Sequence, residues 1–361
     1  MKSLCAEADA DGTTQATYYD IGINGIVGGT FGKGLGNNIV DAYKWLIEEY
    51  TPGDEIFIFG FSRGAYTARS LAGLIAKYGL LKLGAPLGIE QVYERYKRAD
   101  DKTIWKLCQE RDEGSLDENA CSLEERWMLK YSMRVPIKMV GVWDTVGKVG
   151  VPFGRLRGVS SSTLGFLHTG LRQSIENGYH AIAIDEHRNA FPPTLWTVRK
   201  PHDPKESMPK PRPLSSVEQR WFIGAHGNVG GGYPSDVLAQ IPLRWLIRKA
   251  SSLGLAFRNE VELDELSSAH VADSHREFLN GWYQVISPLP CYRKIDGPPK
   301  IDERGTHLTM NETIDRSVFE YWRTGSYRPK NLAEWAKAKK ADPAAIIASV
   351  MASDPSVEVR D

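Results

Sequence analysis

A serine between two glycines is the first candidate for chemistry in this sequence. Ser62 lies in the segment Gly-Phe-Ser-Arg-Gly at residues 60–64, which has the GxSxG pattern of a nucleophile elbow. A serine hydroxyl becomes a useful nucleophile when a base removes its proton and a third group orients that base. GxSxG alone is weak evidence, because a chain of this length would contain one by chance about 0.1 times. A serine that caps a helix after a glycine-rich turn is the structural alternative.

The segments on either side of Ser62 favour the nucleophile. Residues 55–59 are a continuous apolar run typical of a buried parallel strand, and residues 65–78 carry apolar side chains at helical spacing. A tight turn between them would expose the Ser62 hydroxyl at the helix N-terminus, and its two glycines would let strand and helix approach closely. The backbone N–H of Arg63 is then expected to be one oxyanion donor.

Two further residues complete a candidate triad. Asp144 follows an apolar strand at 136–143, and His226 follows a further predicted strand at 219–223. Because parallel strands end at one edge of a sheet, we expect both side chains near Ser62. The chain order Ser, Asp, His is that of α/β hydrolases.

Alternatives remain for the two partners. Asp185 competes for the acid role, although a charge network with Arg188 would suit it equally well. Asp144 is also consistent with a helix cap, and His226 with a buried structural histidine. The glycine-rich segment 227–233 permits a phosphate-binding loop, but it lacks both the GK[ST] ending and the strand-GxGxxG-helix setting. No histidine has metal-ligand spacing, so we expect no metal and no cofactor.

Composition narrows the class of protein. The 361 residues contain 45 Lys and Arg against 45 Asp and Glu, so no net field attracts nucleic acid. The four cysteines are widely separated, which predicts reduced thiols. No apolar run approaches the roughly 20 residues of a membrane span, and the acidic N-terminus lacks a signal-peptide core. We expect a protein that is cytoplasmic in the producing cell and, if exported, has no cleaved leader.

The remaining segments suggest strands alternating with helices. Helices are predicted at 38–50, 163–184, 236–252 and 332–350, a further strand at 194–198, and loops at 22–36 and 200–214. The charged segment 84–134 is read as a helical insertion, with a lid as one interpretation. This pattern predicts an α/β-hydrolase-like fold, a mostly parallel sheet flanked by helices. Residues 1–330 would form the catalytic domain and residues 331–361 a C-terminal helical tail.

Four segments together carry a family resemblance: residues 53–69, 140–147, 183–191 and 221–233. They resemble the bacterial and fungal GFSRGA domain family of α/β hydrolases, which includes phospholipase effectors of type VI secretion systems. The resemblance implies a lipase or phospholipase with Ser62, Asp144 and His226 as its triad. It also implies a lipid or ester substrate, transient contact with a membrane surface, and a secretion or immunity partner.

One departure from the family concerns the N-terminus. Family members usually begin with a strand that ends in Asp-Gly-Thr-x-Asn beside the nucleophile, whereas no apolar strand precedes residues 11–13. We therefore expect the first family strand to be missing. A second oxyanion donor would be lost with it, at a cost of about 2.7–4 kcal/mol in transition-state stabilisation. A weakly active or inactive hydrolase-fold module, and a carboxylesterase for small soluble esters, are the alternatives to a phospholipase.

Overall fold

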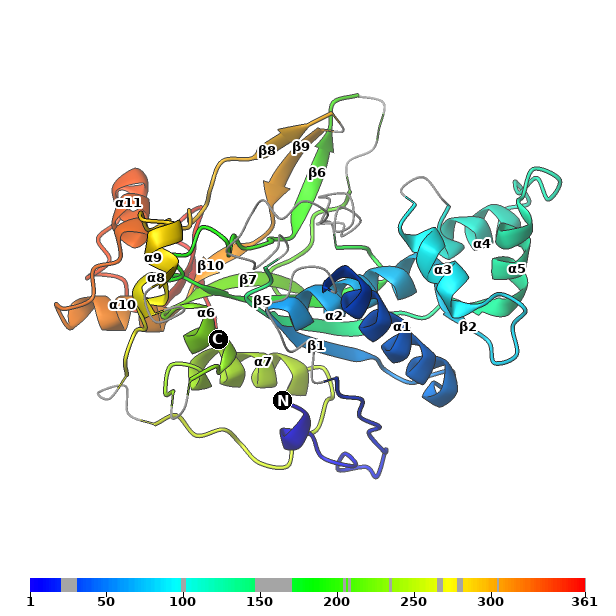
Figure 1. The fold of residues 1–361 in the computed structure, drawn as a ribbon, viewed down its shortest axis with the longest axis horizontal. Coiled ribbons are helices and arrows are strands. Elements are labelled where there is room, and N and C mark those ends of the chain that lie inside the picture. The colour runs from blue at the N-terminus through cyan, green and yellow to red at the C-terminus, as the bar shows by residue number, and fades with distance from the viewer. Residues whose placement is uncertain are drawn as a thin grey trace.

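A computed structural model describes residues 1–20, 31–98, 102–146, 171–203, 206, 209–233, 236–264, 269–277, 282–303 and 305–360 (Figure 1). Its strands are β1 (Phe57–Phe61), β2 (Leu80–Leu81), β3 (Ser132–Met133), β4 (Ile137–Trp143), β5 (Ile175–Ala183), β6 (Thr197–Pro201), β7 (Val217–Phe222), β8 (Lys300–Asp302), β9 (Gly305–Thr309), β10 (Glu312–Ile314), β11 (Ser349–Met351) and β12 (Glu358–Val359). Its helices are α1 (Phe31–Glu49), α2 (Arg63–Tyr78), α3 (Ile89–Tyr96), α4 (Ile104–Asp112), α5 (Leu123–Tyr131), α6 (His226–Gly230), α7 (Gln240–Ser251), α8 (Ser274–Glu277), α9 (Trp282–Ile286), α10 (Arg316–Arg323) and α11 (Lys330–Lys339), with a 3-10 turn η1 (Lys2–Leu4).

A central sheet organises the described residues in the order β1-β4-β5-β7-β10-β11-β12. The pairs from β1 to β10 are parallel, and β11 and β12 add antiparallel strands at the far edge. Strand β4 is buried along almost its whole length, as an apolar run in a covered parallel sheet should be. Strand β7 is equally buried, although it carries Glu218, Gln219 and Arg220. The predicted α/β architecture is therefore confirmed.

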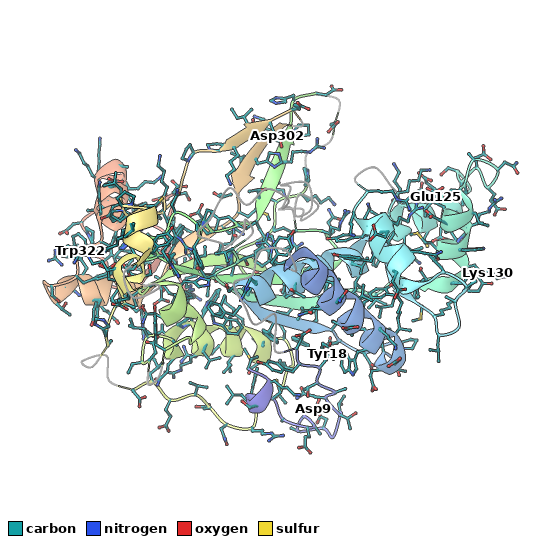
Figure 2. All side chains as sticks on the ribbon, viewed as in Figure 1. Asp9, Tyr18, Glu125, Lys130, Asp302 and Trp322 are labelled. Atoms are coloured by element: carbon teal, nitrogen blue, oxygen red, sulfur yellow. The ribbon has the colours of Figure 1, made fainter. Side chains whose placement is uncertain are left out.

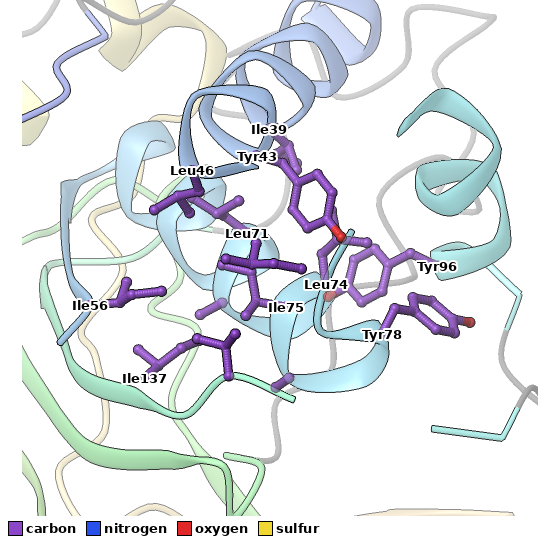
Figure 3. Close-up of a cluster of buried hydrophobic side chains, with 14 of the residues drawn as sticks. Ile39, Tyr43, Leu46, Ile56, Leu71, Leu74, Ile75, Tyr78, Tyr96 and Ile137 are labelled. Atoms are coloured by element: carbon purple, nitrogen blue, oxygen red, sulfur yellow. The ribbon is translucent and has the colours of Figure 1, made fainter. Parts of the chain in front are cut away.

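Helices cover both faces of this sheet. Helices α1 and α2 pack on one face through a core that includes Ile39, Tyr43, Leu71 and Ile75, shown in Figure 3. Helix α7 packs on the other face, where Trp245 lies in the core with residues of β5 and β7. The sheet is thus shielded from water on both sides, and its strand ends are the natural place for exposed chemistry.

The helical prediction for residues 163–184 is wrong over the part that the structure describes. Residues 175–183 form β5, which lies between β4 and β7, and residues 163–170 lie outside the described ranges. Asn177 and Gly178 are poor strand formers, so local composition concealed the strand. Pairing with both neighbours and burial of seven residues in a row from position 177 override that preference.

Two other segments also differ from expectation. Residues 197–201 form β6, which belongs to a separate antiparallel sheet with β8 and β9 and not to the central one. The glycine-rich segment predicted as a loop becomes helical from residue 31 onward, and residues 21–30 lie outside the described ranges. A Cβ atom at Gly36 would lie 3.3 Å from the Tyr93 ring, so helix packing uses the missing side chain there.

The expected C-terminal helical tail is also corrected. Helix α11 ends at Lys339, because Lys340 takes the left-handed conformation with φ +54° and Pro343 follows soon after. Residues 349–351 then form β11, which pairs with β10 in the central sheet. Leu332 and Trp335 of α11 lie in the same core as Trp221 of β7. The described part of this segment, residues 331–360, therefore packs with the main body.

The predicted insertion at 84–134 contains α3, α4 and α5. It begins after the C-terminal end of α2 and returns directly to the start of β4, and β2 and β3 pair across its base. Figure 1 shows α3, α4 and α5 beyond one end of α2, whereas Ser62 precedes the first residue of that helix at its other end. Tyr93 and Tyr96 are buried in the α1–α2 core, while labelled residues such as Glu125 and Lys130 lie at the periphery (Figure 2). The lid interpretation is not supported by this arrangement.

The N-terminal segment packs against residues 256–258: Cys5 forms a β-bridge with Phe257, and the Ala6 N–H donates to the Ala256 carbonyl. Residues 11–13 lie in a turn where Asp9 Oδ1 accepts hydrogen bonds from the N–H groups of Asp11 and Thr13. Among the described residues, β1 pairs only with β4 and forms one edge of the sheet. Within the same ranges, no helix combines the length and apolarity needed to cross a bilayer.

The two glycines of GxSxG differ in their surroundings, and this difference is testable. A Cβ at Gly60 would overlap the carbonyl oxygen of Gly64, whereas a Cβ at Gly64 would meet nothing within 4 Å. Gly60→Ala should lower the free energy of unfolding by about 1–3 kcal/mol, because backbone atoms must move. Gly64→Ala should be neutral or stabilising by up to about 1 kcal/mol, since alanine favours a helix. Urea unfolding of both variants measures the difference, and equal effects would contradict the packing explanation.

Candidate active site

The strand-helix turn at Ser62 has the geometry of an elbow. Ser62 follows β1, has φ +56° and ψ −118°, and immediately precedes α2. A non-glycine residue with positive φ is strained, and such strain gathers at functional sites. The N–H of Ser62 donates to the Trp143 carbonyl at 3.0 Å, which ties the turn to the end of β4. Arg63 is the first residue of α2, so its N–H belongs to the helix N-terminus beside the hydroxyl.

Asp144 lies directly after β4 and is completely buried. Its backbone also has a positive φ, +39°, and its N–H donates to the Ala181 carbonyl at 2.7 Å. The carboxylate oxygen Oδ1 accepts the Ala183 N–H at 3.0 Å. The side chain is thus fixed at the carboxyl end of the sheet by β5.

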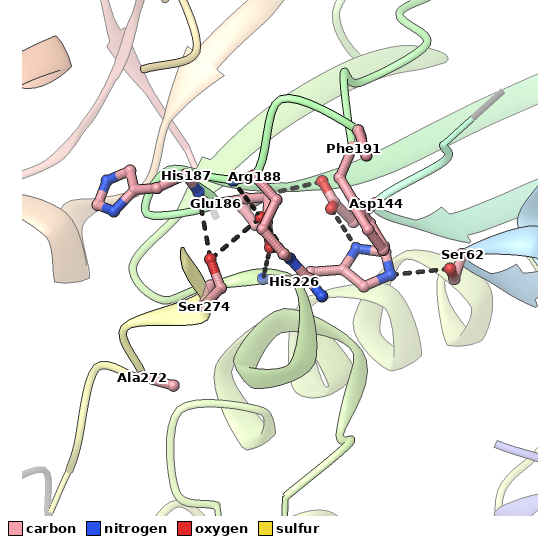
Figure 4. Close-up of polar contacts among 12 residues, drawn as sticks. Ser62, Asp144, Glu186, His187, Arg188, Phe191, His226, Ala272 and Ser274 are labelled. Atoms are coloured by element: carbon pink, nitrogen blue, oxygen red, sulfur yellow. Dashed lines mark hydrogen bonds and ion pairs between the residues drawn. The ribbon is translucent and has the colours of Figure 1, made fainter. Parts of the chain in front are cut away.

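His226 joins the serine and the aspartate, as Figure 4 shows. Its Nε2 lies 2.8 Å from Ser62 Oγ, and its Nδ1 lies 2.5 Å from Asp144 Oδ2. An ionised carboxylate can only accept, so Nδ1 carries the proton and Nε2 is left to accept the serine proton. The three residues predicted as a triad therefore meet in one hydrogen-bonded row.

Arg293 is a site residue that sequence reasoning missed. Its Nη1 lies 2.6 Å from Asp144 Oδ1 and its Nη2 lies 2.9 Å from Oδ2, a bidentate pair out of water. The same guanidinium donates to the carbonyls of Ala183 and Phe191 at 2.8 and 2.7 Å. Arg293 comes from a loop that follows α9, and no motif marks it in the sequence.

The charge of Arg293 decides the ionisation of Asp144. Burial by itself would raise the pKa of this carboxyl, because a carboxylate is poorly solvated away from water. The positive charge of Arg293 and the hydrogen bond from His226 outweigh burial and hold the pKa of Asp144 well below its usual range. Asp144 therefore stays an acceptor and keeps the imidazole in the tautomer that can deprotonate serine.

Two aromatic rings contact the imidazole. The ring centroid of Phe61 lies 4.7 Å from that of His226, and the centroid of Phe191 lies 5.2 Å from it. Arg188 stacks on Phe191, with its guanidinium carbon 3.7 Å from the ring centroid. These contacts restrict the imidazole to the orientation that reaches Ser62.

Asp185, the alternative acid, does not meet the imidazole. Its Oδ2 accepts the Gly224 N–H and the Tyr327 hydroxyl, both at 2.8 Å. Burial raises the pKa of Asp185 to about 6, and these two hydrogen bonds only partly oppose that rise. The predicted network with Arg188 is formed by the neighbouring Glu186, 2.8 Å from Arg188 Nη2. Asp185 thus holds the turn that leads into His226.

The glycines after His226 have a packing role. A Cβ at Gly230 would overlap the Phe61 ring, and one at Gly227 would lie 2.6 Å from the Tyr233 ring. Small residues here let α6 approach β1, the strand that precedes Ser62.

No group of three or more potential metal ligands occurs among the described histidines, cysteines and carboxylates.

Comparison with known proteins identifies the family. Residues 1–249 match the family described as "T6SS, Phospholipase effector Tle1-like, catalytic domain". The chain belongs to this Tle1-like family. This membership agrees with the family resemblance found in the sequence.

Individual relatives match only in part. An uncharacterised protein of Saccharomyces cerevisiae is 31% identical over 177 residues, which are 48% of this chain and 23% of that protein. A crystal structure of an uncharacterised Pseudomonas aeruginosa protein has a TM-score of 0.32 at 18% identity, covering 71% of this chain and 32% of that one. A Tle1 effector solved bound to the VgrG spike has a TM-score of 0.31 at 18% identity, covering 65% and 40%. The Tle1-like chain thus spans less than half the length of each.

Replacing Arg293 tests the electrostatic role of its pair with Asp144. Without Arg293, burial is opposed less strongly, so the pKa of Asp144 should rise and Asp144 should become protonated at a higher pH. In Arg293→Met, the acid limb of the rate of Ser62 modification by a fluorophosphonate should shift to higher pH, while Arg293→Lys should restore part of the wild-type profile.

Arg220→Met is the matched control for that experiment. It removes another buried arginine, one that pairs with Glu218 at 2.7 Å outside the site. This variant should be less stable but should keep the wild-type pH profile. An unshifted acid limb in folded Arg293→Met would contradict the role assigned to Arg293.

The buried Asp185 predicts a pH dependence of stability. Its folded pKa of about 6 lies above the ordinary 3.8, so the folded state binds a proton more tightly than the unfolded state. Its contribution to the free energy of unfolding therefore falls as pH rises from about 4 to 6. Asp185→Asn cannot ionise, so its stability relative to wild type should increase across that window, on the order of 1–3 kcal/mol. Urea unfolding at several pH values checks this, with the exposed Glu113→Gln as a control that should show no such change.

Proposed function

We propose that this chain is a serine hydrolase domain that cleaves carboxylic esters of membrane lipids. Ser62 is the nucleophile, His226 the general base and then acid, and Asp144 the residue that orients the imidazole. The hydrogen-bonded row from Ser62 Oγ through His226 to Asp144 is the observation that carries this proposal. Membership in a family of phospholipase effectors supports a lipid as substrate.

The proposed reaction follows from the positions of these groups. Ser62 Oγ attacks the acyl carbonyl carbon while its proton passes to His226 Nε2. The carbonyl oxygen becomes an oxyanion, toward which the Arg63 N–H at the start of α2 would donate. His226 then protonates the departing alcohol, which leaves an acyl-serine and a free lyso-lipid. Water, deprotonated by the same imidazole, hydrolyses the acyl-serine and releases the fatty acid.

The apolar contacts of the substrate are proposed at the carboxyl edge of the sheet. Phe61 and Phe191 flank the imidazole, and Tyr233 is 38% exposed next to Gly227. The aromatic residues of the 84–134 insertion are less suitable, since Tyr93 and Tyr96 are buried in the core at the other end of α2. In a longer protein of this family, a secretion spike and an immunity protein are the partners we propose.

A variant of Ser62 tests the reaction. Ser62→Ala should abolish covalent labelling by a fluorophosphonate and reduce fatty-acid release from phospholipid vesicles by roughly 10⁴-fold or more, because no nucleophile remains. Ser70→Ala on the same helix is the matched control, since Ser70 is buried and its hydroxyl has no hydrogen-bond partner among the described residues. Labelling that persists in Ser62→Ala would overturn the assignment.

The alternative substrates separate in the same assay. A lipase should turn over more rapidly once its ester substrate forms vesicles or micelles, whereas a carboxylesterase for small esters should follow the dissolved monomer. A folded chain that neither labels nor turns over would favour the inactive hydrolase-fold module.

A further inference from the structure

Two arginines, Arg69 and Arg172, line a small cavity between α2 and the central sheet, away from the triad. The cavity holds about 20 Å³ of free space, and its lining includes Arg69, Tyr96, Arg172 and Trp196. Arg69 lies seven residues beyond Ser62, about two turns along α2. The proposed mechanism uses none of these residues.

Arg69 is a buried cation with hydrogen-bonding capacity to spare. Only 5% of the residue is exposed, and its guanidinium carbon lies 4.8 Å from the Trp196 ring centroid. Nη1 donates to the Thr194 carbonyl, whereas Nε and Nη2 are buried without a hydrogen-bond partner among the described residues. No described carboxylate lies within ion-pair distance of Arg69 or Arg172.

Such an arrangement is costly unless something balances the charge. A buried guanidinium without a counter-charge costs several kcal/mol, and each unsatisfied donor adds to that cost. Burial lowers the pKa of Arg69 to about 9 and also lowers the pKa of Arg172. Burial, together with the positive charge of Arg69, lowers the pKa of the nearby His180 to about 3, so the charge acts well beyond its own side chain.

We propose that this cavity binds a small inorganic anion of the size of chloride. A water-sized particle needs about 10–15 Å³, so the space admits one or two such particles and excludes a phosphate ester. Arg69 supplies two unpartnered donors, and Arg172 supplies a second positive charge on the same cavity. A water molecule would satisfy a donor but would leave both charges without a counter-ion.

The anion would also steady the backbone beside Asp144. Arg69 binds the Thr194 carbonyl, and the Thr194 N–H donates to the Thr145 carbonyl at 2.8 Å. The Thr145 N–H in turn donates to His180 Nε2 at 3.1 Å. Occupancy of the cavity therefore stabilises the segment that follows the triad aspartate.

The test measures anion binding directly. Crystals of the wild-type chain soaked in bromide should show an anomalous peak within hydrogen-bond distance of Arg69 Nε or Nη2. In solution, chloride should raise the Tm saturably by about 3 °C relative to gluconate at equal ionic strength. Arg172→Met and Arg69→Met should each lose this chloride-specific rise.

A matched control excludes a general effect of losing an arginine. Arg134→Met removes an arginine that also stacks on a tryptophan, 5.6 Å from the Trp105 centroid, but that pairs with Asp112 and lines no part of this cavity. It should keep the chloride response. If Arg69→Met does not fold, Arg172→Met and the bromide soak still decide the question.

Three outcomes would overturn the proposal: no bromide peak in the cavity, a chloride response that survives in Arg172→Met, or a bromide peak without any chloride effect on Tm. The result is independent of lipid hydrolysis. Ser62→Ala should bind bromide as wild type does, and a wild-type chain inactive on lipids would still show the peak.

Discussion

The site depends on the contacts that keep the buried Asp144 carboxylate ionised. It lies out of water at the end of β4, where an unpaired carboxylate would cost several kcal/mol. Arg293, the His226 imidazole and the Ala183 N–H together satisfy its two oxygens. Because Arg293 also binds the Phe191 carbonyl, one cation fixes the acid and a residue that packs on the imidazole. The contacts of Arg293 that neutralise the Asp144 carboxylate therefore also help to orient the His226 imidazole.

The parallel sheet supplies the second constraint. Phe61 pairs with Trp143, and Trp143 pairs with Ala181, so β1 and β4 end at one level while β5 continues to Ala183. Ser62 and Asp144 each follow such a strand end with positive φ, a conformation that costs about 1–3 kcal/mol for a residue with a side chain. Burial of the strands beneath offsets that strain. The reactive residues can then turn back over the sheet edge toward each other.

Sequence reasoning found the residues whose positions depend on local pattern. Ser62, Asp144 and His226 each follow a segment predicted as a strand, so the rule that parallel strands end at one edge was enough to place them together. Arg293 lies 149 residues beyond Asp144 along the chain, in a loop without periodicity, and only tertiary packing brings the two together. The same limit concealed β5, in which Asn177 and Gly178 weaken the strand pattern and two neighbouring strands supply the pairing. The helix predicted through residue 350 failed for a related reason, since β11 is defined by pairing with β10.

The candidate site and the helical insertion lie at opposite ends of α2. The insertion of α3 to α5 begins after the last residue of α2 and ends before the first residue of β4, and β2 and β3 pair at its base. Ser62 precedes the other end. Of the two rings that contact the imidazole, Phe61 ends β1 and Phe191 follows β5, while His226 itself follows β7. Any change in the insertion must therefore reach the triad through the body of α2 and the sheet, whereas changes after the strand ends act on it by direct contact. If the proposed lipid hydrolysis is correct, selectivity for an acyl chain or headgroup would therefore come from the segments at the carboxyl ends of the strands, where Phe61, Phe191 and Tyr233 lie.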